Sequence, residues 1–206
     1  MIVLGITGGV GSGKSRILYD MENKYGGHVI EADKLAHKLM EPGKKIYEAV
    51  VNKFGKDILM PEYPFSIDRQ KLGQIVFSDR EKLTLLNEIT HPMVKEYILN
   101  DICLKKKEGK VKLYVIEAAL LIQDGYKDIC DEIWYIWVSR EERIKRLMTS
   151  RGYTREKCIS MMDSQENDRF YRKYANCTIN NNLSYENSSK QLEVRLNKLF
   201  ENVIIA

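Results

Sequence analysis

The first chemistry that this sequence suggests lies in a glycine-rich run near its start, GITGGVGSGKS at residues 5–15. From residue 8 onward the run fits the phosphate-binding pattern G-x-x-x-x-G-K-[ST] at every fixed position. Glycines let the backbone adopt positive φ angles and turn its N–H groups toward phosphate oxygens. Lys14 supplies a charge for the terminal phosphates, and the Ser15 hydroxyl can ligate a magnesium ion. We therefore predict a P-loop made of Gly8, Gly9, Val10, Gly11, Ser12, Gly13, Lys14 and Ser15.

Two other interpretations of this run are weaker. A glycine-rich turn that only reverses the chain does not account for the apolar residues before it and the helix-compatible residues 16–25 after it. A helix at that place would direct its positive dipole end at a bound phosphate. A dinucleotide-binding loop requires G-x-G-x-x-G, which cannot be laid on these glycines.

A pair of carboxylates, Glu31 and Asp33, follows a second apolar run in the segment HVIEAD at residues 28–33. Ligands of open α/β sheets bind at the carboxyl ends of the strands. Neighbouring strands lie about 4.8 Å apart, so one intervening strand would put Asp33 about 10 Å from the P-loop. A carboxylate there could accept the proton of a substrate hydroxyl. Asp33 could equally cap the following helix, and the residues alone leave both roles open.

The elements that must position these residues alternate along the chain. Continuous apolar runs predict five strands, at residues 1–6, 27–30, 113–116, 133–138 and 177–179. Helix-compatible segments separate them, which is typical of a parallel sheet covered on both faces. Together with the P-loop, this pattern predicts an α/β fold of the P-loop NTPase class, a five-stranded parallel sheet flanked by helices that is similar to that of the nucleoside and nucleotide kinases. P-loops also occur in motors, GTPases and ATPases, so the loop alone does not choose the reaction.

We expect a single kinase domain over residues 1–206, with a core at about 1–33, 110–140 and 174–206. The gap between the second and third predicted strands is too long for a simple crossover. Residues 34–109 are therefore expected to form an inserted helical substrate-binding subdomain. Helices are predicted there at 33–40, 44–54, 68–77, 80–90 and 92–107. A basic helical stretch, 141–173, is expected to form a mobile lid, and a last helix, 185–202, to pack on the core.

The bulk composition is that of an ordinary globular protein, with 44% hydrophobic and 30% charged residues. The net charge of +4 does not argue for a nucleic-acid partner and suits polyanionic small molecules such as nucleotides. The four cysteines are scattered without C-x-x-C spacing, and no apolar run reaches membrane-spanning length. We expect a cytoplasmic protein without a membrane partner.

The order and spacing of many short motifs resemble the dephospho-CoA kinase family over most of the chain. The matching residues are 5–15, Val29 to Asp33 with Ala36, Glu41-Pro42-Gly43, Phe54-Gly55, Asp68-Arg69 with Leu72, Val76-Phe77, Thr90-His91-Pro92, Leu120-Leu121, Arg146-Leu147 with Arg151, Gln165, Ala175 and Asn180-Asn181. That family transfers the γ-phosphate of ATP to the ribose 3′-hydroxyl of dephospho-CoA, the last step of coenzyme A synthesis. The resemblance implies a Mg²⁺-dependent phosphotransferase whose small-molecule substrates are ATP and dephospho-CoA.

Roles for three residues follow from the same resemblance. Asp33 aligns with the family aspartate proposed as general base on the 3′-hydroxyl. Lys14 would stabilise charge on the transferring phosphoryl group, and Ser15 would hold magnesium.

The resemblance also implies roles in the expected lid and at the acceptor. Arg146 and Arg151 look like the arginines that close on the ATP phosphates, since a planar guanidinium binds phosphate bidentately. Arg151 could also be a solvated helix arginine. His91 could shape the acceptor pocket as a substrate-binding residue. Our preferred interpretation makes Pro92 the first residue of a helix, with His91 packed beside it.

The chain departs from the family pattern at several positions. The usual Pro-Leu-Leu-x-Glu becomes Ala119-Leu120-Leu121-Ile122-Gln123, Tyr171 stands where an arginine is expected, and Asn176 and Glu31 each replace an aspartate. These changes leave two alternatives: a kinase of the same fold for another nucleoside or nucleotide acceptor, and a nucleotide-binding regulator without transfer activity. The oligomeric state and the role of Glu117, at the end of the third predicted strand, stay open.

Overall fold

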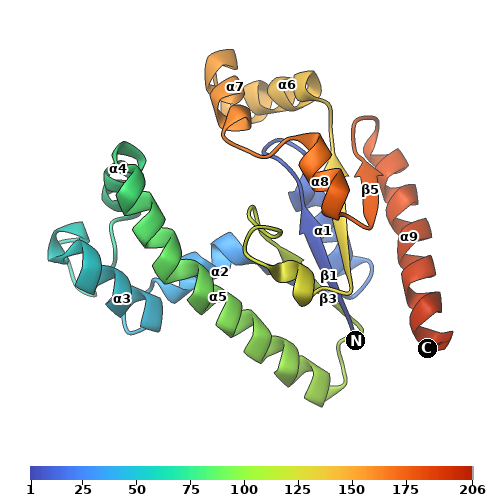
Figure 1. Ribbon diagram of the computed structural model, residues 1–206, viewed down its shortest axis with the longest axis horizontal. Coiled ribbons are helices and arrows are strands. Elements are labelled where there is room, and N and C mark those ends of the chain that lie inside the picture. Colours follow the sequence, from blue (N-terminus) through green and yellow to red (C-terminus); the bar gives the residue numbers. More distant parts are fainter. Residues whose placement is uncertain (206) are drawn as a thin grey trace. The chain divides into compact units, whose positions relative to one another are not determined.

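Five apolar runs form the strands, as the sequence predicts. In the computed structural model, which describes residues 1–205 and side chains through residue 201, the strands are β1 (Ile2–Thr7), β2 (His28–Glu31), β3 (Leu113–Glu117), β4 (Glu132–Trp137) and β5 (Cys177–Asn180). They form one sheet in the order β2-β3-β1-β4-β5 (Figure 1). β1 pairs in parallel with β3 and β4, and β4 pairs in parallel with β5. The predicted α/β fold with a five-stranded parallel sheet is confirmed.

The central strand β1 is buried along its whole length, which explains its continuous apolar sequence. Two helices, α1 (Lys14–Asn23) and α9 (Tyr185–Ile205), pack on one face of the sheet. Their buried side chains include Ile17 and Met21 from α1 and Leu192 and Leu196 from α9. This core fixes the carboxyl end of β1 and the start of α1, the two points between which the glycine-rich loop must span.

Two residues just before strands bind the neighbouring strand in the same way. The Asp131 carboxylate accepts from the Val3 amide at 2.7 Å, and the Asp131 amide donates to the Val3 carbonyl at 2.8 Å. Asn176 makes the equivalent pair with Ile133, at 2.8 Å in both directions. Asn176, a departure from the family pattern, therefore continues the hydrogen-bonding of the sheet.

The basic stretch after β4 folds as three helices, α6 (Arg140–Arg151), α7 (Arg155–Asp163) and α8 (Asp168–Tyr174). Gly152 ends α6 in the left-handed conformation, at φ 63°, and the Thr154 side chain caps α7. Ile144, Leu147, Cys158 and Met162 form a small apolar core between α6 and α7. Within the described residues, no helix is both long and apolar enough to cross a bilayer.

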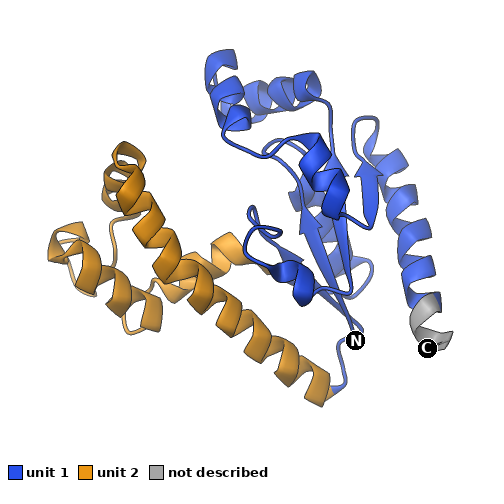
Figure 2. Ribbon diagram, viewed as in Figure 1, with its two compact units in different colours: residues 1–29, 109–206 blue, residues 30–108 orange. Residues whose placement is uncertain are grey.

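The chain divides into two compact units, residues 1–29 with 109–206 and residues 30–108 (Figure 2). The first unit also holds a short 3₁₀ turn, η2 (Tyr126–Asp128). The second unit is helical and consists of α2 (Ala32–Leu39), α3 (Lys45–Phe54), the 3₁₀ turn η1 (Lys56–Ile58), α4 (Arg69–Ser78) and α5 (Arg80–Glu108). Within it, α5 packs against α2, α3 and α4.

The prediction of separate helices at 80–90 and 92–107 is wrong, because α5 is continuous and contains Pro92 in its interior. Our preferred interpretation of Pro92 as a first helical residue is therefore wrong too. Proline removes a backbone donor from a helix and disfavours its continuation. Buried residues at four-residue spacing, Thr90, Val94, Ile98 and Ile102, run across the proline on one face of α5. This packing outweighs the local cost of the proline.

Candidate active site

The glycine-rich loop connects β1 to α1 without regular structure of its own. Gly11 and Gly13 have positive φ angles, 78° and 81°, and Gly13 is the N-cap of α1. These angles are readily available to glycine alone, so both positions depend on the absence of a side chain. The Ser12 amide donates to the Gly9 carbonyl at 3.1 Å and closes a turn within the loop. The loop therefore ends at a helix N-terminus, where backbone N–H groups attract anions.

Two buried hydroxyls at this loop lack hydrogen-bond partners. Among the described residues, the hydroxyls of Thr7 and Ser12 are buried and unpaired. Burying a hydroxyl without a partner is unfavourable by about 1–3 kcal/mol. Unpaired hydroxyls at the ends of a phosphate-binding loop fit a ligand that brings its own acceptor oxygens.

Lys14, the first residue of α1, is folded back over the loop. Its Nζ donates to the Gly8 carbonyl at 2.7 Å and lies 3.4 Å from Oε1 of Glu117. Glu117 ends β3 directly beside Ile6 of β1. Both side chains are largely buried, with 17% and 11% of their surface exposed. The carboxylate therefore holds the ammonium at the mouth of the loop, where the terminal phosphates of a nucleotide would compete for it.

A buried amide ties the end of β5 to the same loop. Asn181 is 5% exposed, and its Nδ2 donates to the Ser12 carbonyl at 2.8 Å. Its Oδ1 accepts from the Ser188 hydroxyl at 2.7 Å. The Asn181 carbonyl accepts from Nη2 of Arg146 at 2.9 Å, and Nε of Arg146 donates to Glu142 at 3.0 Å. Asn181 therefore holds both the loop and the arginine that the sequence assigns to ATP.

The first unit thus brings together the P-loop, Lys14, Ser15 and Arg146. Ser15 lies exposed in the first turn of α1. Arg151 is different: it is exposed at the end of α6, with its guanidinium 6.0 Å from the centre of the Tyr153 ring. That position matches the interpretation of Arg151 as a solvated helix arginine.

Asp33 and His91 belong to the second unit. Asp33 is exposed in the first turn of α2, and no hydrogen bond or ion pair engages it among the described residues. The N-cap of α2 is Glu31, so the alternative role of Asp33 as the cap of this helix is wrong. His91 is half-buried beside Pro92 within α5. Its acceptor-side role stays a prediction.

Sequence reasoning missed Arg143 and assigned no role to Asn181. Nε of Arg143 donates to the Val10 carbonyl of the loop at 2.7 Å. Three arginines, at 140, 143 and 146, lie within two turns of α6, and nothing in their spacing singles out the middle one. Asn181 follows the last strand, β5, and it contacts the loop only because the fold brings the end of β5 next to Ser12.

Tyr171, where the family pattern has an arginine, is a buried structural residue. Its ring stacks on Tyr135 with centroids 4.9 Å apart. The Tyr135 hydroxyl donates to Asp168 at 2.7 Å, and the Trp137 indole donates to the other carboxylate oxygen at 2.6 Å. Burial raises the pKa of Tyr135, and the hydrogen bond to Asp168 raises it further. The Tyr135 hydroxyl therefore stays protonated as a donor at neutral pH.

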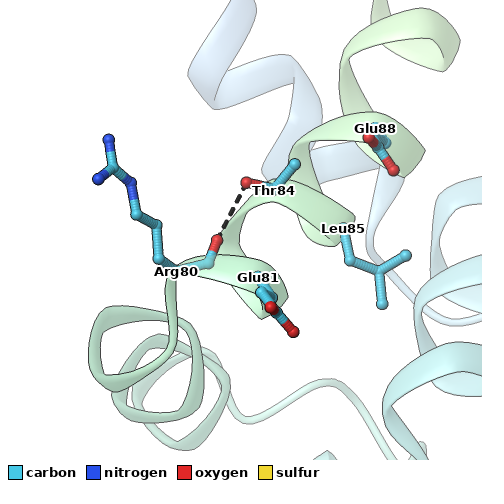
Figure 3. Close-up of a pocket in the computed structure, with 5 residues that line it drawn as sticks. All are labelled: Arg80, Glu81, Thr84, Leu85 and Glu88. Atoms are coloured by element: carbon cyan, nitrogen blue, oxygen red, sulfur yellow. Dashed lines mark hydrogen bonds between the residues drawn. The ribbon is translucent and has the colours of Figure 1, made fainter.

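A separate hollow in the second unit carries no comparable arrangement. It has a volume of about 510 Å³ and lies on the first turns of α5, lined by Arg80, Glu81, Thr84, Leu85 and Glu88 (Figure 3). The Arg80 side chain extends away from the Glu81 and Leu85 side chains, and Thr84 bonds back to the Arg80 carbonyl.

The chain is similar to known proteins over nearly its whole length. Residues 2–187 match the family model described as Dephospho-CoA kinase. A dephospho-CoA kinase of Carboxydothermus hydrogenoformans is 37% identical over 95% of this chain and 93% of its own length. One of Listeria monocytogenes is 35% identical over 97% of this chain and 98% of its own.

Solved structures give the same result at the level of the backbone. The dephospho-CoA kinase of Campylobacter jejuni superposes with a TM-score of 0.71 and 27% identity, over 97% of this chain and 98% of its own. A shikimate kinase of Acinetobacter baumannii superposes with a TM-score of 0.51 and 14% identity, over 96% of this chain and 94% of its own, which is a likeness of fold alone.

Replacing Asn181 with alanine is expected to weaken ADP binding about tenfold, because the Ser12 carbonyl loses the side-chain amide that holds it, while the backbone carbonyl that binds Arg146 remains. Isothermal titration calorimetry measures this directly. The matched control is Asn187→Ala, which removes an exposed asparagine of α9. Equal ADP affinity in wild type and Asn181→Ala would show that Asn181 does not support the loop.

Proposed function

The chain belongs to the dephospho-CoA kinase family, and from this membership we propose how its residues divide the work of phosphoryl transfer. It is a phosphotransferase with dephospho-CoA kinase activity. In the reaction, the 3′-hydroxyl oxygen of dephospho-CoA bonds to the γ-phosphorus of ATP, the bond to the β-phosphate oxygen breaks, and the hydroxyl proton leaves. ADP and coenzyme A are the products.

We assign the binding of the ATP phosphates to residues 8–15. The observation that carries this assignment is a complete P-loop pattern at residues 8–15, where the buried hydroxyls of Ser12 and of the preceding Thr7 have no partner among the described residues. Lys14, held by Gly8 and Glu117, would move its ammonium to the γ-phosphate as charge develops there. Arg146 would add a second cation on the phosphates from α6.

We assign Asp33 as the general base that receives the proton of the 3′-hydroxyl. The strand order supports this role, because a single strand, β3, separates β2 from β1 and α2 follows β2 directly. The exposed Asp33 carboxylate, without a partner among the described residues, is available for a substrate hydroxyl. Phosphoryl transfer requires mainly positioning and charge stabilisation, and a base contributes on the order of 10²–10⁴-fold.

We propose that the enzyme works with Mg²⁺, held by Ser15. Hydroxyl and carboxylate oxygens are suitable ligands for this ion, which binds through few protein groups and the phosphates themselves. Within the described residues, no three or more histidine, cysteine or carboxylate side chains form a group that could hold a metal ion by themselves, so the nucleotide phosphates would have to complete the coordination. When bound, the ion would neutralise charge on the β- and γ-phosphates.

Asp33→Asn is expected to lower kcat on the order of 10²–10⁴-fold, because the amide cannot take up the hydroxyl proton. ADP affinity should stay within twofold of wild type, since Asp33 has no role in the P-loop. Steady-state kinetics and calorimetry measure the two quantities. Asp57→Asn, an exposed aspartate of the same unit, is the control. Wild-type turnover by Asp33→Asn would remove Asp33 as the base.

Ser15→Ala is expected to raise the Mg²⁺ concentration needed for half-maximal turnover by roughly tenfold or more, as for other lost metal-supporting groups. Excess Mg²⁺ should restore much of the turnover, since the other ligands remain. A titration of activity with Mg²⁺ at saturating ATP measures the shift, with the exposed Ser160→Ala as control. Superimposable titrations for Ser15→Ala and wild type would exclude Ser15 as a ligand.

A further inference from the structure

Val10 occupies a variable position of the P-loop pattern. Both its backbone carbonyl and its backbone amide form hydrogen bonds with side chains from outside the loop. Nε of Arg143 donates to the Val10 carbonyl at 2.7 Å. The Val10 amide donates to Oε1 of Gln165 at 3.0 Å. Nη2 of Arg143 donates to the same oxygen at 2.9 Å, which closes a triangle of three hydrogen bonds. The Val10 side chain also packs against the apolar core of α6 and α7.

Arg143 is buried to an extent that is rare for arginine, with 9% of its surface exposed. Its guanidinium retains its charge at neutral pH. Burial lowers the pKa of the Arg143 guanidinium, and the nearby Tyr135 and Asp168 side chains partly oppose this shift. Asp168 is bound in turn by Tyr135 and Trp137 of β4. The segment that carries Gln165 is thus anchored to the sheet three residues further on.

Gly9 provides the space that the guanidinium occupies. A Cβ atom at this position would lie only 2.2 Å from Nη2 and 2.5 Å from Cζ of Arg143. The P-loop pattern leaves this position variable, and the φ angle of Gly9 lies outside the left-handed range that favours glycine. The glycine is therefore required by the arginine that packs on it.

We propose that Arg143 and Gln165 form a clamp that sets the orientation of the P-loop amides, with Gly9 as the surface on which the clamp packs. The carbonyl of Val10 and the amide of Gly11 share one trans peptide plane and point in opposite directions. Holding the carbonyl on Arg143 therefore presents the Gly11 amide on the other side, for the phosphates. This inference rests on the proposed binding of ATP phosphates by the loop.

The clamp differs from a simple link between helices. Arg140, one turn earlier on α6, pairs with Asp163 at the end of α7 at 2.8 Å, with both side chains about half exposed. That pair joins the same two helices, and within the described residues neither side chain hydrogen-bonds to the loop. Arg140→Met is therefore the matched control, since it removes an arginine of α6 without removing a loop contact.

The first experiment measures ADP affinity by calorimetry for wild type, Arg143→Met, Gln165→Leu, the double variant and Arg140→Met. Each clamp variant should bind about tenfold more weakly, because each loses a hydrogen bond to Val10, a charge-assisted one to the carbonyl for Arg143 and a neutral one from the amide for Gln165. The double variant should lose little more than either single one, since the residues act as a unit. KM for dephospho-CoA and the binding of Arg140→Met should stay near wild type. Thermal unfolding without ligand checks that each variant is folded.

The outcomes separate this inference from the proposed function. No ADP binding by the folded wild type would contradict phosphate binding by the loop. Tight wild-type binding with an unchanged affinity in Arg143→Met would overturn the clamp alone. An equal loss in Arg140→Met and Arg143→Met would also overturn it, because the effect would then come from linking α6 to α7. Should Arg143→Met fail to fold, Gln165→Leu carries the same test.

A second experiment examines Gly9. Gly9→Ala should weaken ADP binding about tenfold in the wild-type background, because the new methyl group displaces the guanidinium. In the Arg143→Met background the same change should have an effect of less than about threefold, since a thioether side chain can move aside. The same loss in both backgrounds would show that Gly9 does not serve the clamp.

Discussion

The phosphate-binding loop has to be held in one conformation although it contains little that would hold it by itself. Four of its six residues between β1 and α1 are glycines, and glycine loses the most conformational freedom on folding. One hydrogen bond, from the Ser12 amide to the Gly9 carbonyl, closes within the loop. The remaining constraint comes from side chains elsewhere in the first unit, and phosphate binding depends on them.

These supports come from late in the chain and from separate elements. Glu117 at the end of β3 holds Lys14, Arg143 and Gln165 hold Val10, and Asn181 after β5 holds Ser12. The parallel sheet makes this possible, because strands far apart in sequence end at the same edge. Two departures from the family pattern lie in the same unit. Tyr171 stacks on Tyr135, and Asn176 extends the hydrogen-bonding of the sheet. Their contacts are structural, and they leave the P-loop residues unchanged.

Those parts of the account that depend on local patterns could be predicted from the sequence. The P-loop is contiguous, and the buried strands appear as continuous apolar runs, so both were accessible before the structure. The continuity of α5 through Pro92 could not be predicted from the sequence, because it depends on packing against three other helices. The contact of Arg143 with the loop could not be predicted either. Its burial against Gly9 is a property of the folded chain, and its spacing in α6 matches that of the neighbouring arginines. Asp33 could be assigned as base or cap from sequence, and the position of Glu31 at the N-cap removes the second choice.

The central claim is that this loop and its supports bind ATP for transfer to dephospho-CoA. The most direct test is a coupled assay of ADP release with ATP, Mg²⁺ and dephospho-CoA, run beside reactions without acceptor and with AMP as acceptor. The account predicts ADP release that requires dephospho-CoA and is matched mole for mole by coenzyme A. Tight ATP binding with no release that depends on dephospho-CoA, or faster release with AMP, would contradict it.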